Sequence, residues 1–369
     1  MTAPLSTAIS NCWTREHLEP FVVGVFLGEG VGAEVISAAL TILDILAAKC
    51  RKKIDVKFGG KIGRCAADES GKPLPEEAVA FCESVFASGG AVLCGPGSAR
   101  FVYEMRARFD LFCKLTPLRP APELIDAALI RPESLTGVDI MAVRENAGGL
   151  YFARESLGRT PDGGQYVEAK FNYCQRQVQR ILDVAERLAL QRGGRVCLVV
   201  KRDGVPAMSN LWCEVAHQHE GRAPVEWRVL DIDNAVYQLV ADPKSFDVLV
   251  SPNMFGDVLA DCGSLLLGSR GLSYSGNFSD DGKGVFQTGH GAAYDLAGTG
   301  RVNPVGQILA LAMMLEEAFN WREGAEIVRR AVYRTLGDGV RTQDIRGARQ
   351  SAVGCREMTQ RIGDALEQT

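Results

Sequence analysis

Short apolar runs alternate with longer amphipathic segments along this chain, and this alternation constrains the fold more than any other feature. The runs "FVVGVF" (21–26), "RVCLVV" (195–200) and "FDVLVS" (246–251) have the length and continuity of buried strands. Apolar residues recur at helical spacing from about Ala33 to Lys49 and from Val178 to Leu188. Further strands are expected at 90–98, 110–118, 138–146 and 227–230, and further helices near 210–219, 233–241 and 304–319, the last capped by Asn303. Strands alternating with helices predict an α/β fold.

The length and the charge narrow the class of protein. A chain of 369 residues is too long for one small core, so two domains or a large domain with a second lobe are expected. The formal charge is −4 and no block of Lys and Arg is present, which argues against nucleic acid as a partner. No apolar run reaches 18 residues and the N-terminus does not resemble a secretion signal, so no membrane association is expected.

The 11 cysteines are scattered, with no CxxC pair, and several stand in apolar runs. This usage is typical of reduced, buried thiols and predicts a cytoplasmic protein. Only four histidines are present, and "HQH" (217–219) is interpreted as a polar helix end rather than as a pair of zinc ligands.

Two aspartates, Asp257 and Asp261, follow the apolar run at 246–251 in a stretch of small and apolar residues. At a spacing of four they lie on one face of a helix, with Cβ atoms about 5–6 Å apart. Two carboxylates so close repel each other unless a cation lies near them, and Mg²⁺ or Mn²⁺ suits such a pair. The alternative is that Asp257 caps a helix, which explains one aspartate and leaves the other unexplained.

Four longer motifs carry a resemblance to a known family. They are "GEGVGAEV" (28–35), "VRENAGGLY" (143–151), "NMFGDVLAD" (253–261) and "GHGAAYDLAGTGRVNP" (289–304), and they occur in the family's order. They resemble GDGIGPEV, VRExTGGIY, NxFGDILSD and VHGSAPDIAGKGIANP of the β-decarboxylating dehydrogenases, which act on isocitrate, isopropylmalate, homoisocitrate and tartrate. The resemblance covers roughly residues 20–365.

The resemblance implies an isopropylmalate-dehydrogenase-like fold of two α/β domains that share one large mixed sheet. This fold is not a Rossmann fold, so "GEGVG" is not a dinucleotide fingerprint. Residues 1–113 with 266–369 would form a larger cofactor-binding domain, and residues 114–265 a smaller domain with dimer contacts. The polar segment at about 152–170 would be a protruding arm or hairpin. A homodimer with active sites shared between its subunits is expected.

The same resemblance implies the chemistry, which is oxidation of a 2-hydroxy acid with loss of a carboxylate. Asp257 and Asp261, with Asp233 of the other subunit, would hold Mg²⁺ or Mn²⁺. Lys201, its pKa lowered beside the metal, would help to deprotonate the hydroxyl, and Tyr151 would protonate the enolate. Taken alone, these two residues would be interpreted as a surface lysine and a core tyrosine.

The substrate-binding residues depart from the family. Arg106 and Arg144 occupy two of its three arginine positions, but Thr116 stands at the third, with Lys114 two residues away. Arg100 belongs to the segment that contacts the substrate's variable side group. The expected substrate is a 3-substituted malate other than isocitrate or isopropylmalate, with a polar or anionic side group. Asp203, Gly204 and Tyr294 are further departures, of unassigned effect.

The resemblance also indicates the cofactor. Asp295 matches the aspartate of NAD-dependent members, where a carboxylate binds both ribose hydroxyls and repels a 2′-phosphate; NADP-dependent members place a Lys–Tyr pair at Asp295 and Leu296. His290 and Asn303 match adenine-contacting positions, and Gly291 belongs to the same motif. Taken alone, Asp295 would be a turn residue. Two alternatives stay open: a non-catalytic regulatory subunit, and a tartrate-like dehydrogenase without obligatory decarboxylation.

Overall fold

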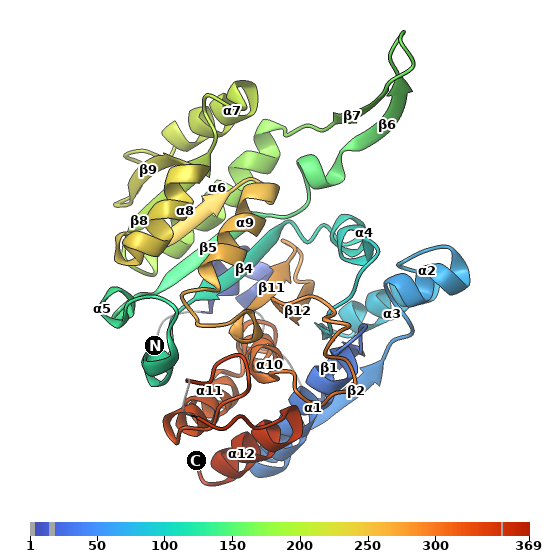
Figure 1. The fold of residues 1–369 in the computed structure, drawn as a ribbon, viewed down its shortest axis with the longest axis vertical. Helices are drawn as coiled ribbons and strands as arrows, with labels where there is room; N and C mark the ends of the chain where they lie inside the picture. Colours follow the sequence, from blue (N-terminus) through green and yellow to red (C-terminus); the bar gives the residue numbers. More distant parts are fainter. Residues whose placement is uncertain (1–3, 15–18, 348–349) are drawn as a thin grey trace.

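The computed structural model describes residues 4–14, 19–347 and 350–369. Its centre is a ten-stranded sheet in the order β2-β1-β3-β12-β11-β4-β5-β10-β8-β9 (Figure 1). β11 is antiparallel to β12 and β4, and β4 is antiparallel to β5, whereas the other neighbours are parallel. The strands are β1 Phe21–Phe26, β2 Ile54–Phe58, β3 Ala91–Cys94, β4 Cys113–Leu118, β5 Ile140–Glu145, β8 Arg195–Val200, β9 Glu226–Asp231, β10 Val248–Ser251, β11 Tyr274–Phe278 and β12 Gly284–Thr288. The fold is therefore α/β with one large mixed sheet, as predicted, and not a Rossmann arrangement.

The sheet has two halves that differ in their place in the chain. β1, β2, β3, β11 and β12 come from the two ends of the sequence, and β4, β5, β8, β9 and β10 come from its middle. β4 and β11 join the halves through an antiparallel pair. The boundaries of the two predicted domains stay a prediction.

Helices cover both halves of the sheet (Figure 1). With the terminal half lie α1 Gly32–Cys50, α2 Arg64–Ser70, α3 Glu76–Ala87, α4 Phe101–Arg108, α10 Val305–Glu317, α11 Arg322–Gly337 and α12 Cys355–Glu367. With the middle half lie α5 Pro132–Leu135, α6 Gln175–Leu190, α7 Pro206–His217, α8 Ile232–Ala241 and α9 Asn253–Gly263. α10 is buried along nearly its whole length between α1, α11 and the sheet. It begins one residue after the predicted start, and Asn303 Oδ1 accepts a hydrogen bond from the Val305 amide (3.0 Å).

A two-stranded hairpin projects from the body of the molecule (Figure 1). It consists of β6 Arg154–Arg159 and β7 Gln165–Lys170, with Leu157 opposite Val167. Both of these apolar side chains are exposed. A lone two-stranded hairpin of this kind is only marginally stable in water.

The chain's first described residues link the two halves of the sheet. The 3₁₀ turns η1 Leu5–Ala8 and η2 Asn11–Thr14 lie against α6 and the β11–β12 turn. The Ser6 amide donates to Glu317 of α10 (2.7 Å), whereas Arg187 of α6 donates to the carbonyls of Ala8 and Ile9 (3.2 Å for the latter). The remaining 3₁₀ turns are η3 Pro122–Ala127, η4 Leu150–Phe152, η5 Pro243–Ser245 and η6 Arg270–Leu272.

Two further sequence expectations can be compared with the structure. His217 ends α7, as predicted for "HQH", but His219 is fully buried, with Nδ1 3.1 Å from Glu186 and its ring beside Trp227. His219 is therefore a core residue and not part of a polar helix end. Within the described residues, no helix is long and apolar enough to cross a membrane.

Candidate active site

The predicted substrate residues gather at one edge of the sheet, where parallel strands end. Arg144 lies near the end of β5, Lys201 follows β8, and α9 with Asp257 begins just after β10. Lys114 of β4 stands opposite Arg144 in the antiparallel β4–β5 pair. Ligands of α/β sheets bind at the carboxyl ends of the strands, so this edge is the expected position for a site.

Three cations with few counter-charges define the site. Arg106 of α4 and Arg144 are 4% and 3% exposed. Among the described residues, Nε and Nη1 of Arg106 and Nη2 of Arg144 have no hydrogen-bond partner. Burial and the charges of Arg144 and Arg106 lower the pKa of Lys114 to about 7, and burial with the charge of Arg144 lowers the pKa of Arg106 to about 9. Buried donors without acceptors are unfavourable, so the cluster suits an anionic ligand.

Asp257 is the carboxylate that faces this cluster. It accepts hydrogen bonds from Arg144 and from the Tyr151 hydroxyl (2.9 Å). Burial would raise the pKa of Asp257, but the charges of Arg144 and Lys114 hold it below its usual range. Burial and the Asp257 carboxylate raise the pKa of Tyr151 to about 12. Tyr151 therefore keeps its proton at neutral pH, which suits a proton donor.

α9 comes close to β5 because it carries a glycine where the two meet. A Cβ atom on Gly256 would lie 2.8 Å from Cβ of Arg144, a distance that side chains do not adopt. Asn253, at the start of the same helix, accepts a hydrogen bond from Nε of Arg144 (2.8 Å), and its amide donates to the Tyr173 hydroxyl (3.0 Å). The sequence analysis did not identify Asn253 and Tyr173, although Asn253 is the first residue of the "NMFGD" motif.

Arg100 and Tyr103 of the α4 segment form an aromatic and cationic wall beside Tyr151. Arg100 donates to the Tyr151 carbonyl (2.8 Å), and its guanidinium lies 5.0 Å from the centre of the Tyr103 ring. The rings of Tyr103 and Tyr151 meet edge to face at 5.5 Å. Thr116 is buried two residues beyond Lys114 in β4, so it lies on the same face of the strand. Because Thr116 carries no charge, the third cation at this edge, beside Arg106 and Arg144, is Lys114.

The three predicted metal ligands do not come together within one chain. Asp257 is paired with Arg144, Asp261 with Arg270 (2.9 Å), and Asp233 with Lys201 (2.6 Å). No group of three His, Cys, Asp or Glu side chains in the described parts of the chain could hold a metal ion. The hydrogen bond with Asp233 raises the pKa of Lys201 in the single chain, whereas the sequence analysis expected a lowered value.

The predicted cofactor residues lie on the loop after β12, which packs against the turn after β1. The Val31 amide donates to the Ala292 carbonyl (2.9 Å), and a Cβ on Gly30, which has a positive φ of 56°, would collide with that carbonyl. Leu296 packs against Val31 in a small apolar cluster, whereas Asp295 is exposed.

The remaining predicted cofactor residues of this loop differ in how many of their polar groups already form hydrogen bonds within the protein. Asn303 is buried and fully engaged, since it donates to Asp344 (3.1 Å) and accepts from Val305. Nδ1 of His290 lies 2.8 Å from the Gly291 carbonyl, and burial lowers the pKa of His290. Nε2 of His290 is buried and has no partner among the described residues, whereas Gly291 is open to solvent.

Glu29, which the sequence analysis did not identify, holds the cofactor loops together. Its carboxylate accepts hydrogen bonds from the Cys65 amide (3.0 Å), the Ser98 amide (2.7 Å) and the Ser98 hydroxyl (2.6 Å). Burial would raise the pKa of Glu29, but these hydrogen bonds lower it. The Ser98 hydroxyl lies 3.1 Å from the Tyr294 hydroxyl, so Tyr294 joins this network. Glu29 could have been identified from its place inside "GEGVG". That motif is not a Rossmann fingerprint, but it does mark a loop of this site.

An anion-binding cluster at the strand ends, a tyrosine that keeps its proton and a separate loop after β12 suit an enzyme that acts on a carboxylate-bearing substrate. The model of the isocitrate/isopropylmalate dehydrogenase family matches residues 22–362. The chain is 37% identical over 352 residues to the 3-isopropylmalate dehydrogenase of Oleidesulfovibrio alaskensis, covering 92% of this chain and 98% of that one. It is also 37% identical to the 3-isopropylmalate dehydrogenase of Carboxydothermus hydrogenoformans, covering 94% and 95%.

A solved structure agrees with these relatives. The isocitrate dehydrogenase of Methylococcus capsulatus superimposes with a TM-score of 0.82 at 26% identity, covering 94% of this chain and 99% of that one. The chain therefore belongs to the isocitrate/isopropylmalate dehydrogenase family. It is an NAD-dependent, decarboxylating hydroxy-acid dehydrogenase that uses Mg²⁺ or Mn²⁺.

Proposed function

We propose that this enzyme oxidises and decarboxylates a 3-substituted malate whose 3-substituent is polar or anionic, rather than isocitrate or isopropylmalate. The observation that carries the proposal is the cluster of Arg106, Arg144 and Lys114: the buried N–H groups of the two arginines have no partner among the described residues and call for more than one anionic oxygen. The wall that Arg100 and Tyr103 form beside this cluster is cationic and aromatic rather than aliphatic, which supports a polar side group.

In this proposal the chain's own residues bind the substrate and move its protons. Arg106 and Arg144 orient the carboxylates, with Lys114 in place of a third arginine, and Tyr151 donates the proton that the enolate carbon needs. Asp257 and Asp261, with Asp233 of the partner subunit, would hold the divalent cation, which stabilises negative charge on the substrate oxygens. His290, Gly291, Asp295, Leu296 and Asn303 would hold NAD, which accepts the hydride when bound.

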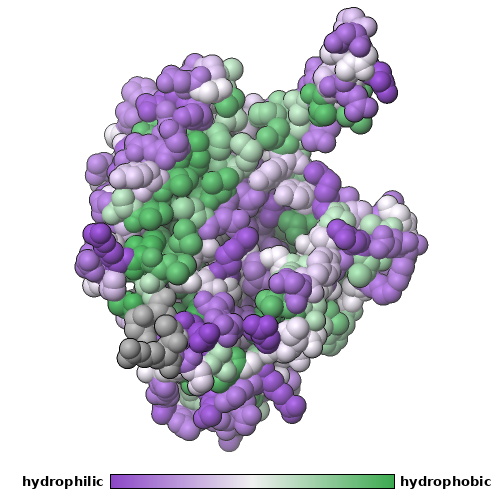
Figure 2. Space-filling view, in the orientation of Figure 1, coloured by the Kyte–Doolittle hydropathy of each residue, from purple (hydrophilic) through white to green (hydrophobic). Residues whose placement is uncertain are grey.

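We also propose that two copies of the chain share each active site, in a cytoplasmic homodimer. Tyr237 of α8 and Val258 of α9 are 72% and 46% exposed, and Figure 2 shows an apolar area over these helices. Asp233 stands at the start of α8, and the projecting hairpin also carries exposed apolar side chains. The unpaired state of all eleven cysteines supports the cytoplasmic location.

A mixing experiment tests the shared site. Lys201 pairs with Asp233 of its own chain (2.6 Å), so in this proposal both residues enter the site from the subunit opposite Asp257. Lys201→Met and Asp257→Asn are each expected to be inactive, and co-refolded in equal amounts they are expected to recover about a quarter of the wild-type activity, because half of the dimers are mixed and each mixed dimer has one intact site. Mixing Asp257→Asn with Asp261→Asn is the matched control, since both changes then fall on the same side of the site and no recovery is expected. Recovery in the control, or none in the test, would overturn the shared site.

A substrate panel tests the substrate. With NAD and Mn²⁺, malates with carboxylate or hydroxyl groups in the 3-substituent are expected to have kcat/KM values at least about tenfold above that of 3-isopropylmalate. Preference for 3-isopropylmalate would overturn the proposal and would give this enzyme the same substrate as the relatives named 3-isopropylmalate dehydrogenase. Tartrate belongs in the panel, because Thr116 stands where the family has its third substrate-binding arginine.

The substitution Thr116→Arg is expected to raise activity on isocitrate or isopropylmalate.

A further inference from the structure

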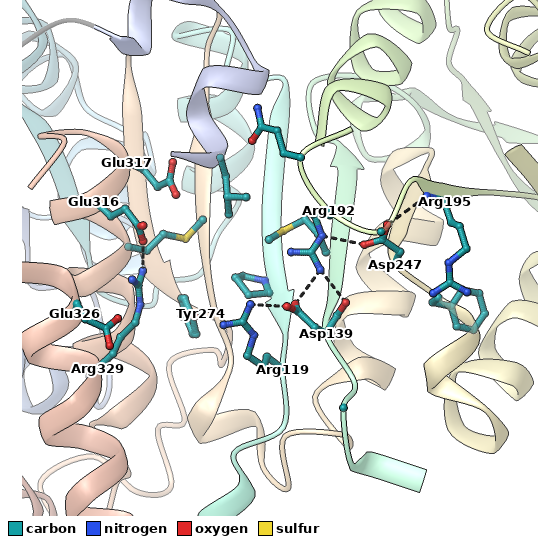
Figure 3. Close-up of a pocket in the computed structure, with 18 of the residues that line it drawn as sticks. Arg119, Asp139, Arg192, Arg195, Asp247, Tyr274, Glu316, Glu317, Glu326 and Arg329 are labelled. Carbon is teal, nitrogen blue, oxygen red and sulfur yellow. Dashed lines mark hydrogen bonds and ion pairs between the residues drawn. The ribbon is translucent and has the colours of Figure 1, made fainter. Parts of the chain in front are cut away.

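A cavity of about 660 Å³ lies at the opposite edge of the sheet from the active site (Figure 3). Asp139 and Asp247 line it just before β5 and β10 begin, whereas Arg144 and Asp257 follow from the other ends of these strands. Its other wall is formed by α10 and α11. The cavity therefore lies between the two halves of the sheet and has the size of a small-molecule site.

The wall at the strand starts carries an excess of positive charge. Arg192 donates to Asp139 (2.8 Å) and Asp247 (3.0 Å), which engages both carboxylates, and Arg119 also donates to Asp139. Arg195 and Lys244 line the same wall. Arg119 is 63% exposed and uses only Nη2 within the described structure, so donors remain on its guanidinium.

The wall formed by α10 and α11 carries an excess of negative charge. It presents Glu316, Glu317 and Glu326 and one cation, Arg329, which pairs with Glu316 (Figure 3). Glu317 is buried and accepts a hydrogen bond from the Ser6 amide, and burial raises its pKa to about 7, so the lasting negative charge of this wall comes from Glu316 and Glu326. Glu326 makes no hydrogen bond or ion pair with another described residue and is exposed.

Several neutral groups that line the cavity also lack partners. Oε1 of Gln191 is buried and accepts no hydrogen bond within the described residues. The hydroxyl groups of Tyr274 and Tyr333 likewise make no hydrogen bond to the part of the chain that the structure describes. Buried polar groups are normally paired, so an acceptor left alone in a cavity of this size points to a ligand that donates to it.

We propose that this cavity binds a small zwitterion, such as an amino acid, with its ammonium group toward the α10–α11 carboxylates and its carboxylate toward Arg119. Each wall attracts one end of such a molecule, whereas a singly charged compound would be repelled by the opposite wall. A bound zwitterion would contact both halves of the sheet.

Calorimetric titration of the intact enzyme tests this proposal. The probes are ω-amino acids from glycine to 6-aminohexanoate, and the singly charged controls are butanoate and butylamine. At least one length is expected to bind at least about tenfold more tightly than either control. No binding of any zwitterion at about 10 mM, or equal binding of the controls, would overturn the proposal.

Two single substitutions locate the site. Arg119→Gln and Glu326→Gln are each expected to weaken the best zwitterion at least about tenfold, because each removes the charge that holds one end. Glu323→Gln on the outer side of α11, whose carboxylate does not line the cavity, is the matched control and is expected to bind normally. Unchanged binding in both test variants would place the ligand elsewhere. All three variants should keep full dehydrogenase activity, which shows that they are folded.

Discussion

Buried arginines stand at both edges of the central sheet, but their surroundings differ. At the strand ends, Arg144 donates to Asp257 and Asn253, but within the described part of the chain its Nη2 and two nitrogens of Arg106 have no partner. At the strand starts, Arg192 is 12% exposed and donates from Nε to Asp247 and from Nη2 to both the side chain and the carbonyl of Asp139. Among the described residues, Arg106 and Arg144 therefore keep buried nitrogens without a partner, whereas Arg192 has no such nitrogen.

This difference separates a binding residue from a structural one. A guanidinium whose buried nitrogens are all engaged stabilises the fold, because removing it leaves a buried carboxylate, here Asp247, without its ion pair. A buried guanidinium with free donors is held in an unfavourable state until an anion arrives, so it is retained for binding. Burial alone would not distinguish the two, since both are largely shielded from water.

The largest expected effect is on activity at the strand ends. Arg144→Met should lower kcat/KM at least about 10³-fold, because it removes donors to the substrate and leaves Asp257 without its cation. Steady-state kinetics on the best substrate measures this. Arg192→Met is the matched change at the other edge and should keep kcat/KM within about threefold at low temperature. Equal losses of activity in both variants would break the distinction between the edges.

The next effect is on stability, and it falls on the opposite edge. Arg192→Met should lower the free energy of unfolding by about 3 kcal/mol, because the buried Asp247 carboxylate loses the cation that it pairs with, whereas the partly exposed Asp139 keeps Arg119. Urea unfolding followed by circular dichroism measures the change. Arg195→Met, whose guanidinium contacts only carbonyls at 3.3–3.4 Å, should lower it by less than about 1 kcal/mol. A larger loss in Arg195→Met than in Arg192→Met would contradict this view.

A third effect concerns the exposed cofactor loop. Asp295→Lys should shift the ratio of kcat/KM for NADP over NAD upward by about 10–100-fold, because the carboxylate that repels a 2′-phosphate becomes a cation. Asp280→Lys, in the β11–β12 turn, is a control for added charge and should leave the ratio unchanged. A ratio that does not move in Asp295→Lys would leave the cofactor role of this loop unsupported.

The smallest effect is a pH dependence at the strand ends. Because the pKa of Lys114 is lowered to about 7, the side chain is charged below pH 7 and neutral above it. Affinity for an anionic substrate should therefore fall as the pH rises from 6 to 8, with kcat/KM dropping by up to about tenfold. In Lys114→Met this step should disappear from the pH profile. A step that persists in the variant would assign it to another group.

The sequence predicts strands best where they are continuous and apolar. β8 was predicted at its observed bounds, 195–200, whereas β2 (54–58) was missed because Asp55 and Lys57 alternate with its apolar residues. β11 and β12 lie at the centre of the sheet but were missed in a glycine-rich segment. Gly276 packs against Phe278 and Phe286, and Gly284 against Phe286 and Trp13, so tertiary packing rather than local propensity makes these segments strands.

The active-site residues could be named from motifs, but their partners could not. The resemblance pointed to Arg144 and Asp257, which stand 113 residues apart, yet no periodicity indicates that they pair with each other. Lys114 and Arg144 are neighbours because they stand opposite each other in the β4–β5 pair, and the register of these strands cannot be read from the sequence. Likewise Arg192, Asp139 and Asp247 come from three segments, and nothing local marks them as a network.

The contact of Ser6 with Glu317 has a consequence for how this enzyme is made. These residues are 311 positions apart, so a chain emerging from the ribosome cannot form the contact until residue 317 has been synthesised. The middle half of the sheet, whose strands all lie between residues 113 and 251, is available to fold much earlier. Locking the first turns of the chain against α6 and α10 is therefore a late step in the maturation of the enzyme, taken after the middle half has formed.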